Sequence, residues 1–436
     1  MSLWAFRFLL WYICILIVQP QHRFPFLMPF RIANLCMVIA TGLHIGSALI
    51  EGRPVFRFGP ATKLALALLG FGLISQYAGL MQTYTGWNSY IDMLVKNAYM
   101  LILIEATAIT VERVWAVPTT MALATLWWIK GGLRLSQAGA TWGMGDRIMG
   151  PASGLVQDPN FFAYMMGVFM PLYLYYSRSG DRKLVRWAGL AVALASFFIS
   201  LRTGSRAGLL QLVALGALML PRYWFHHRRA LLIAVAAFFF LVPLSGKQNI
   251  ERFKTLPESI SAFLQGRDEK KAGPDAYSAM ERRTKIADTW ALIQEYPLFG
   301  VGMNPDESLF RDEYWGATAQ VHCEILMAGR QMGYIGMSMH VGFLLIPFLI
   351  GRSVQKRWAG SWPALSDMGY TIKMMALMFA IGGSFLPLPW HPILLALNGT
   401  ASALYLNLKA LEEAERAGLV PAGRLPDTAG PLTTTA

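Results

Sequence analysis

The stretch SFFISLRTGSRAGLLQLVAL, at residues 196–215, reads like a membrane span that is interrupted by charge. Apolar residues lie on both sides of Arg202 and Arg206, and only the three residues TGS separate the two arginines. A charged side chain near hydrocarbon is costly, so it is normally excluded from a span or put to use. Whether this stretch is one costly span or two spans joined by a polar turn depends on the rest of the chain.

The composition is that of an integral membrane protein. Of the 436 residues, 55% are hydrophobic and 14% are charged, whereas soluble domains carry about 25% charged residues. Apolar runs of roughly 17–25 residues recur, which is the length that crosses a bilayer as a helix, and the alternating pattern of an outer-membrane barrel is absent. The sequence predicts an all-α, polytopic inner-membrane protein. No small-residue cleavage site follows the first run, so we expect 1–18 to be a retained span.

The apolar runs predict about twelve transmembrane helices in a single domain, residues 1–411. We expect them near residues 3–18, 31–50, 61–82, 90–111, 114–132, 161–176, 185–201, 207–220, 230–244, 332–350, 370–386 and 392–408. The helix at 332–350 could begin earlier, because the stretch CEILMAGRQMGYIGMSM is itself fairly apolar.

The basic residues predict the orientation. The net charge is +13, and most lysines and arginines lie in alternate short loops, as the positive-inside rule expects of cytoplasmic loops. This distribution explains the charge without a nucleic-acid partner. Both termini are then cytoplasmic, and the turn between Arg202 and Arg206 lies at the periplasmic surface. The tail 412–436 is rich in Ala, Gly, Pro and Thr, and we expect it to be disordered.

Two longer connections fall on the predicted outer face. The loop 246–321 contains the charged, turn-rich stretch QGRDEKKAGPDAYS, followed by MERRTKIADTWALIQEYPLFGVG. In the second stretch Ile286, Trp290 and Ile293 recur at helical spacing, which predicts an amphipathic helix that ends before Pro297. The other connection, roughly 134–160, is rich in glycine and ends in GLVQDPN.

Several polar residues share this outer face. They are Asp158, Asn160, Arg202, Ser205, Arg206, Arg282, Arg283 and His322. Arginines here run against the positive-inside rule, which makes them more informative than the cytoplasmic ones. The planar guanidinium suits phosphate, and the TGS before Arg206 could cap the next helix and leave N–H groups for an anion.

Each candidate also has a structural interpretation. Arg202 could extend to lipid head groups, and the arginines at 282 and 283 could be solvated on a polar helix. His322 could be a satisfied residue at the mouth of a span, and Asp158 could cap the helix that follows it. Arg206 is harder to explain in this way, because it lies among small residues at the start of a span.

Four motifs, taken in order, carry a family resemblance. They are DPNFFAYMM, then LRTGSRAGLL at the junction of two spans, then an arginine followed by YPLFGVG in the long outer loop, and then His322 with Gly333 eleven residues later. In order, spacing and topology, from about residue 154 to 336, the chain resembles the O-antigen ligase and polymerase superfamily. Within it the chain looks most like the O-glycosylation ligases that accompany exosortase systems.

The resemblance implies a glycosyltransferase without metal or nucleotide cofactor. Such enzymes transfer a glycan from an undecaprenyl-diphosphate carrier to an acceptor hydroxyl outside the inner membrane, and the acceptor would be a glycan, a lipid A-core or a protein. Arg206 matches the arginine of the family's SR-G motif, Arg282 best matches the loop arginine, and His322 matches the family histidine.

Two positions depart from the family pattern. Cys323 stands where the family often has Asn or Ser, and Ile286 stands where a tryptophan commonly follows the loop arginine by four residues. The second departure leaves Arg282 and Arg283 as alternatives.

The residue types fit this chemistry independently. A lipid diphosphate leaving group develops negative charge, which preorganised cations such as Arg206 and Arg282 stabilise well. No acidic cluster that could hold Mg²⁺ is visible in the outer segments. His322, which titrates near neutral pH, would accept the proton of the acceptor hydroxyl or orient it. The remaining outer-face candidates are expected to contact substrate.

Other functions use some of the same features. A polymerase that joins lipid-linked repeat units would have an almost fully overlapping pattern. A transporter of lipid-linked glycans is disfavoured, because no convincing internal repeat is visible and the single long outer loop is asymmetric. The outward arginines argue mildly against a purely structural subunit.

Overall fold

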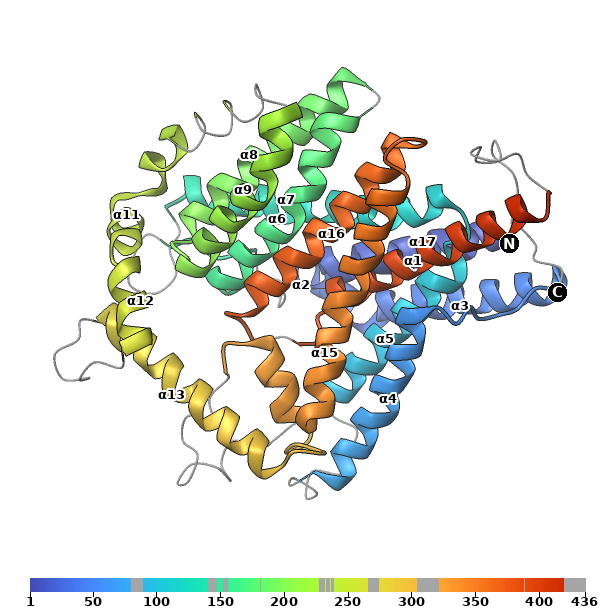
Figure 1. The fold of residues 1–436 in the computed structure, drawn as a ribbon, viewed down its shortest axis with the longest axis horizontal. Coiled ribbons are helices and arrows are strands. Elements are labelled where there is room, and N and C mark those ends of the chain that lie inside the picture. The colour runs from blue at the N-terminus through green and yellow to red at the C-terminus, as the bar shows by residue number, and fades with distance from the viewer. Residues whose placement is uncertain are drawn as a thin grey trace.

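The protein is a bundle of helices in a computed structural model (Figure 1). The structure describes residues 1–79, 89–139, 147–151, 156–180, 182–226, 232, 236, 239–265, 274–303, 321–387 and 389–418. Within these residues the chain forms helices and no strand, so the predicted all-α class is confirmed. Five described helices are long and apolar enough to cross a membrane: Pro25–Ile50, Pro60–Ala78, Lys183–Arg202, Glu324–Arg357 and Pro363–Gly383. The number and direction of the crossings stay predictions.

The helices follow the predicted apolar runs. They are α1 Ser2–Val18, α2 Pro20–Arg23, η1 Pro25–Phe30, α3 Ile32–Ile50, α4 Pro60–Ala78, α5 Ser89–Thr107, α6 Val111–Gln137, α7 Pro159–Ser179, α8 Lys183–Arg202, α9 Arg206–His226, η3 Pro243–Ser245, α11 Lys247–Lys254, α12 Leu256–Gln265, α13 Pro274–Glu295, α15 Glu324–Arg357, α16 Pro363–Gly383 and α17 Pro392–Arg416. Each predicted span except 230–244 coincides with one of them, and of 230–244 the structure describes 232, 236 and 239–244. α17 extends to Arg416, so the first residues of the predicted tail are helical, whereas 419–436 lie outside the described residues.

α17 forms part of the core of the bundle. Its first thirteen residues are all buried, and it packs against α4, α5, α6, α15 and α16. The sequence PILLALNGTASAL carries no charge, and a helix that is apolar on every side is stable only when it is surrounded by other helices. Small residues in the helix let a neighbouring backbone approach closely. A Cβ added at Gly399 would lie only 3.0 Å from the carbonyl oxygen of Leu101 in α5.

The stretch 196–215 is two helices joined by a turn. α8 ends at Arg202 and α9 begins at Arg206, so the two arginines flank the turn. Gly204 has φ 61°, a left-handed conformation that favours glycine. The Ser205 hydroxyl accepts a hydrogen bond from the Gly208 N–H at 3.1 Å and thereby caps the start of α9. The sequence therefore avoids placing two charges in the middle of a span.

α15 is a helical hairpin. Met332 and Gly333 have non-helical conformations, and they separate a short arm, residues 324–331, from a long arm, residues 334–357. Glu324 Oε2 lies 3.3 Å from His340 Nε2, although sixteen residues of straight helix would separate them by about 24 Å. The two arms therefore fold back on one another (Figure 1, orange).

Gly333 has φ 60° and ψ −158°, a conformation that is essentially restricted to glycine. A Cβ there would lie 2.2 Å from the carbonyl oxygen of Pro297. The apolar stretch before Met332 is therefore an arm of its own and not an extension of one straight span.

The long loop carries three helices. α11, α12 and α13 form an arc along one side of the bundle, from the region near α8 to the tip of the α15 hairpin (Figure 1). α13 ends at Glu295, so a helix does precede Pro297; its Leu292 and Ile293 are buried, whereas Trp290, predicted on the same apolar face, is exposed. The position of this loop relative to the membrane stays a prediction.

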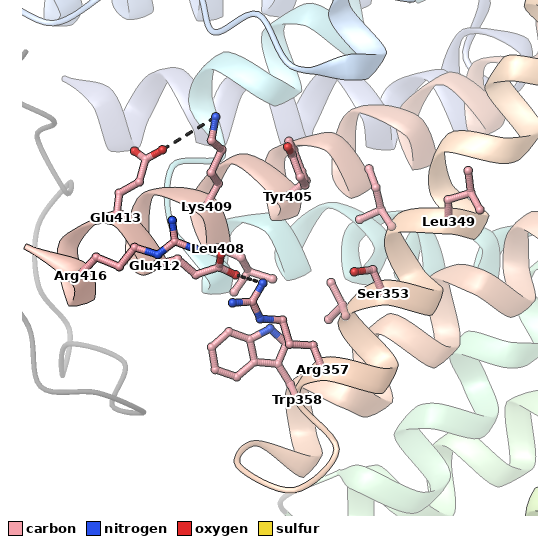
Figure 2. A pocket seen from close by; sticks show the side chains of 12 residues that line it. Leu349, Ser353, Arg357, Trp358, Tyr405, Leu408, Lys409, Glu412, Glu413 and Arg416 are labelled. Atoms are coloured by element: carbon pink, nitrogen blue, oxygen red, sulfur yellow. Dashed lines mark ion pairs between the residues drawn. The ribbon is translucent and has the colours of Figure 1, made fainter.

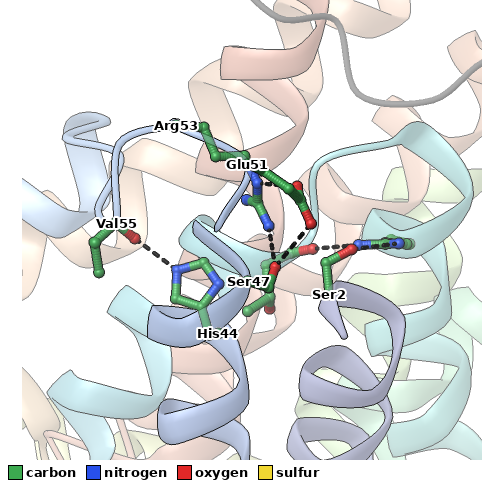
Figure 3. Close-up of polar contacts among 8 residues, drawn as sticks. Ser2, His44, Ser47, Glu51, Arg53 and Val55 are labelled. Carbon is green, nitrogen blue, oxygen red and sulfur yellow. Dashed lines mark hydrogen bonds and ion pairs between the residues drawn. The ribbon is translucent and has the colours of Figure 1, made fainter. Parts of the chain in front are cut away.

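At the end of the bundle opposite the long loop, polar side chains interact with residues close to them in the chain. Arg53 Nε lies 2.5 Å from Glu51 Oε2, and His44 Nε2 lies 2.6 Å from Val55 O (Figure 3). An open groove of about 480 Å³ between α15 and α17 also lies there, and its rim carries the ion pair between Arg357 Nη1 and Glu412 Oε1 at 2.7 Å (Figure 2). The groove lies at the C-terminal end of α15, whereas His322 directly precedes the N-terminus of α15, so the groove and His322 are separate.

Candidate active site

The turn between α8 and α9 is fixed from three directions. Arg147 Nε donates to the carbonyl oxygen of Thr203 at 2.8 Å, and the Ile148 N–H donates to that of Arg202 at 3.1 Å. The side-chain amide of Asn249 in α11 also donates to Arg202 O, at 3.1 Å. The last carbonyls of a helix have no partner within the helix, so these three donors hold the turn, and with it Arg206, in one place.

Four arginines from separate segments gather beside this turn. Arg206 begins α9, Arg282 lies in α13, Arg252 lies in α11, and Arg147 lies between α6 and α7. Burial lowers the pKa of Arg282, and the positive charges of Arg206 and Arg252 lower it further. Burial and the charges of Arg252, Arg282 and Arg206 lower the pKa of Arg147 to about 10. The charges of Arg206 and Arg252 therefore act on both Arg147 and Arg282, which are partly buried.

The long loop contacts the start of α9, directly after the α8–α9 turn. Arg206 Nη1 donates to the hydroxyl of Ser259 in α12, so α12 lies over the start of α9. Arg282 is partly buried and is coupled electrostatically to Arg206, whereas the neighbouring Arg283 is exposed. The geometry thus favours Arg282 between the two alternatives that the sequence left open.

Among the described residues, Asp158 and Glu281 are the carboxylates that act on Arg147 or Arg282. The charge of Asp158 opposes the pKa lowering in Arg147 and Arg282, and Glu281 already pairs with Lys285 at 2.7 Å. Asp158 also caps α7, because its Oδ1 accepts from the backbone N–H of Asn160 at 2.7 Å. The cluster of Arg147, Arg206, Arg252 and Arg282, which we call the arginine cluster, is therefore rich in positive charge.

The other sequence candidates have structural contacts. Arg202 Nε donates to Ser136 Oγ at 3.0 Å, and its Nη1 donates to Ser245 O at 2.8 Å, which connects α8 to α6 and η3. Asn160 Oδ1 accepts from Arg147 Nη2 at 3.0 Å and so orients that arginine. Ser205 is buried and occupied as a helix cap. Substrate contact by these three residues stays a prediction.

His322 lies against the arginine cluster. Burial and the charges of Arg282 and Lys285 lower the pKa of His322 to about 4, and Asp158 and Glu281 oppose this effect. The imidazole is therefore neutral at neutral pH and able to accept a proton. Its Nδ1 is buried and has no hydrogen-bond partner among the residues that the structure describes. Such an atom is costly to leave unpaired, so it marks a place where a ligand group would bind.

The motif YPLFGVG fixes the far end of the short arm. The N–H groups of Val301 and Gly302 donate to the carbonyls of Arg330 and Gln331, at 2.9 and 3.2 Å. The Ser75 hydroxyl of α4 donates to the same Gln331 carbonyl at 2.7 Å. The eleven-residue spacing of His322 and Gly333 therefore spans the short arm, 324–331, and the residues that flank it, and YPLFGVG supplies the donors that cap its C-terminal end.

Cys323 is the N-cap residue of this short arm. Burial raises the pKa of its thiol, although the N–H groups of Leu326 and Ile325 oppose this effect. Asn and Ser are preferred N-cap residues, so the departure at this position exchanges a strong cap for a weaker one. It leaves the direction of the short arm unchanged.

The family comparison covers this site. Residues 190–341 match the family model described as O-antigen ligase. The chain carries an O-antigen ligase domain. The matched segment runs from α8 into the long arm of α15, contains Arg206, Arg282 and His322, and supports the resemblance to the O-antigen ligase and polymerase superfamily. No curated protein matches the chain. The narrower likeness to exosortase-associated ligases stays a prediction.

Sequence reasoning missed Arg147 and Arg252. Both lie in segments predicted to be outside, where basic residues run against the positive-inside rule, so the signal that selected Arg206 applied to them as well. Their convergence on one turn depends on long-range packing that no local pattern reveals. Among the described residues, no group of three or more His, Cys, Asp or Glu side chains is placed to hold a metal ion.

Proposed function

We propose that the protein transfers a glycan from an undecaprenyl-diphosphate carrier to an acceptor hydroxyl, on the periplasmic side of the bacterial inner membrane. The observation that carries this proposal is the gathering of four arginines from four segments beside a neutral, partly buried histidine. The family match supports an enzyme of the ligase and polymerase type. The twelve-span topology with both termini in the cytoplasm belongs to the same proposal.

The arginine cluster would bind the diphosphate. Crowded like charges repel one another in a partly buried site, so the cluster is most stable with an anion between its members. Arginine binds phosphate oxygens with two parallel hydrogen bonds. When the glycosidic bond to the diphosphate breaks, negative charge grows on the leaving oxygen. Cations that are already in position stabilise that charge without reorganising.

His322 would activate the acceptor. The acceptor hydroxyl oxygen forms a bond to the anomeric carbon while the bond between that carbon and the diphosphate oxygen breaks. The hydroxyl proton passes to the imidazole of His322, which later returns it to water, and the bonding electrons leave with the lipid diphosphate. Because burial and nearby cations keep His322 neutral, it is in the protonation state that a general base needs.

Donor binding would also strengthen this base. The charges of Arg282 and Lys285 lower the pKa of His322 in the empty site. A diphosphate bound between Arg206 and Arg282 would offset that positive charge and raise the pKa of His322 towards neutral. The imidazole would then become a better proton acceptor only when the donor is present.

The test is a transfer assay with purified protein. The protein is supplied with an undecaprenyl-diphosphate glycan and, in separate reactions, a lipid A-core, a free glycan and a protein acceptor, and the products are identified by mass spectrometry. We expect a new glycosidic bond and release of undecaprenyl diphosphate. Extension of the donor itself would assign the polymerase reaction, and movement of the intact donor across vesicles without bond formation would overturn the proposal.

A further inference from the structure

Two buried titratable side chains lie close to each other at the start of the short arm, two residues after His322. Glu324, the first residue of the short arm, is 1% exposed, and His340, in the long arm, is 0% exposed. Their carboxylate oxygen Oε2 and imidazole Nε2 are 3.3 Å apart. Placing such groups in the interior is costly unless they interact with one another and with further partners. Neither side chain belongs to the arginine cluster.

A second helix holds the same carboxylate. The hydroxyl of Tyr164 in α7 donates to Glu324 Oε1 at 3.2 Å, and this tyrosine is 2% exposed. α16 leaves the room for both groups. A Cβ at Gly383 would lie 2.5 Å from Glu324 Oε2, and a Cβ at Gly382 would lie 2.2 Å from the Tyr164 ring. Three elements, α7, α15 and α16, therefore enclose one side chain at the start of the short arm.

The short arm is thus held at both ends. Its C-terminal carbonyls accept hydrogen bonds from Val301, Gly302 and Ser75. Its first residue, Glu324, is held through its carboxylate by Tyr164 and His340. His322 lies two residues before Glu324, and within the described part of the chain its Nδ1 makes no hydrogen bond. The place of the imidazole is therefore set by the backbone that precedes the short arm and by the contact that anchors it.

We propose that Glu324 is a positioning residue for His322, held in place by Tyr164 and His340. This inference rests on the proposed function of His322. A displacement of about 1 Å at a catalytic group can lower the rate about 100-fold. The donor is bound by arginines on α9, α11 and α13, so loss of the anchor lowers the rate of transfer and leaves donor binding unchanged.

The sharpest test is a matched pair of substitutions on α7. Tyr164→Phe removes only the hydroxyl that donates to Glu324. Tyr173→Phe removes an equally buried hydroxyl nine residues away, which pairs with Thr125 Oγ1 at 2.5 Å. We expect Tyr164→Phe to lower kcat about tenfold with an unchanged KM for the donor, and Tyr173→Phe to keep the kcat of the unchanged protein.

Two further variants test the anchor itself. Glu324→Ala is expected to lower kcat about 100-fold, and Glu324→Gln, which keeps the shape and one acceptor oxygen, is expected to recover a large part of that loss. Gly383→Ala pushes on the carboxylate without removing it and serves if Glu324→Ala does not fold. Donor affinity, measured separately with each purified variant, is expected to stay within about twofold.

Failure of this inference is distinct from failure of the proposed function. If Tyr164→Phe, Gly383→Ala and Glu324→Gln all keep full kcat while His322→Ala is inactive, the positioning role is wrong and the function stands. Equal losses in Tyr164→Phe and Tyr173→Phe, or a rise in donor KM with unchanged kcat, would also overturn it. Full activity in His322→Ala would instead contradict the proposed function.

Discussion

Basic side chains at the two ends of the bundle are arranged in opposite ways. At one end Arg178 and Arg222 both pair with Asp367, and Arg222 also stacks on the ring of Tyr370. At the other end, the charges of Arg206 and Arg252 lower the pKa of both Arg147 and Arg282, and among the described residues Asp158 opposes both effects and Glu281 opposes the effect on Arg282. The first arrangement pairs its charges within the protein, whereas the second is the one that we propose binds an anion. Charge that is left unbalanced at one place in a protein is therefore a better sign of function than charge itself.

The largest expected effect is on His322 and Arg206. His322→Ala removes the proposed base and is expected to lower kcat by about 10²–10⁴.

Arg206→Ala removes one of the cations that would stabilise the leaving group and is expected to lower kcat by about 10²–10³. Both are measured as initial transfer rates with purified protein. A loss below tenfold in both variants would contradict the proposed difference in role between the arginine cluster and the arginines that pair with Asp367.

A smaller effect is expected at the edge of the arginine cluster. Arg252 is partly buried, and its Nε has no hydrogen-bond partner in the structure. A charge-assisted hydrogen bond contributes about 1.5–3 kcal/mol, so Arg252→Ala is expected to weaken donor binding by about tenfold or more. The measurement is a donor titration at low salt. Unchanged affinity would remove Arg252 from the cluster's binding role.

The pH dependence gives a third effect. At a pH below its pKa of about 4, His322 is protonated in the free protein and cannot act as a base. The pH dependence of kcat/KM reports the free enzyme, so kcat/KM is expected to fall on the acid side near pH 4. Bound diphosphate raises the pKa, so the acid limb of kcat is expected about 1–3 units higher. Coincident limbs in the two profiles would contradict the proposed strengthening of the base by the donor.

The paired end is expected to affect stability and not catalysis. Asp367→Asn removes the charge that Arg178 and Arg222 share, and all three side chains are partly exposed. Because these ion pairs are neither fully exposed nor fully buried, their loss is expected to lower the free energy of unfolding by about 1–2 kcal/mol. Thermal unfolding in detergent measures the loss, and transfer by the folded protein should stay within twofold. A large loss of transfer would show that the two ends are coupled.

Much of the helix layout could be predicted from the sequence, because apolar runs of membrane length are a strong local signal. The α15 hairpin could not, because both arms are apolar and only the conformation of Gly333 separates them. The charges of the arginine cluster were visible as exceptions to the positive-inside rule. Their convergence was visible only for the residues that the family motifs connect, which is why Arg206 and Arg282 were found and Arg147 and Arg252 were not.

The most direct test of the central claim compares two adjacent arginines. Arg282 is partly buried and acts on Arg147 and His322, whereas Arg283 is exposed on the same helix. Transfer from an undecaprenyl-diphosphate glycan is measured in a single turnover with Arg282→Ala and Arg283→Ala. The structure predicts a loss of about 10²–10³ for Arg282→Ala and a change below about twofold for Arg283→Ala, since isolated surface substitutions have small effects. Equal rates in the two variants, or the larger loss in Arg283→Ala, would contradict the claim that the arginine cluster carries the reaction.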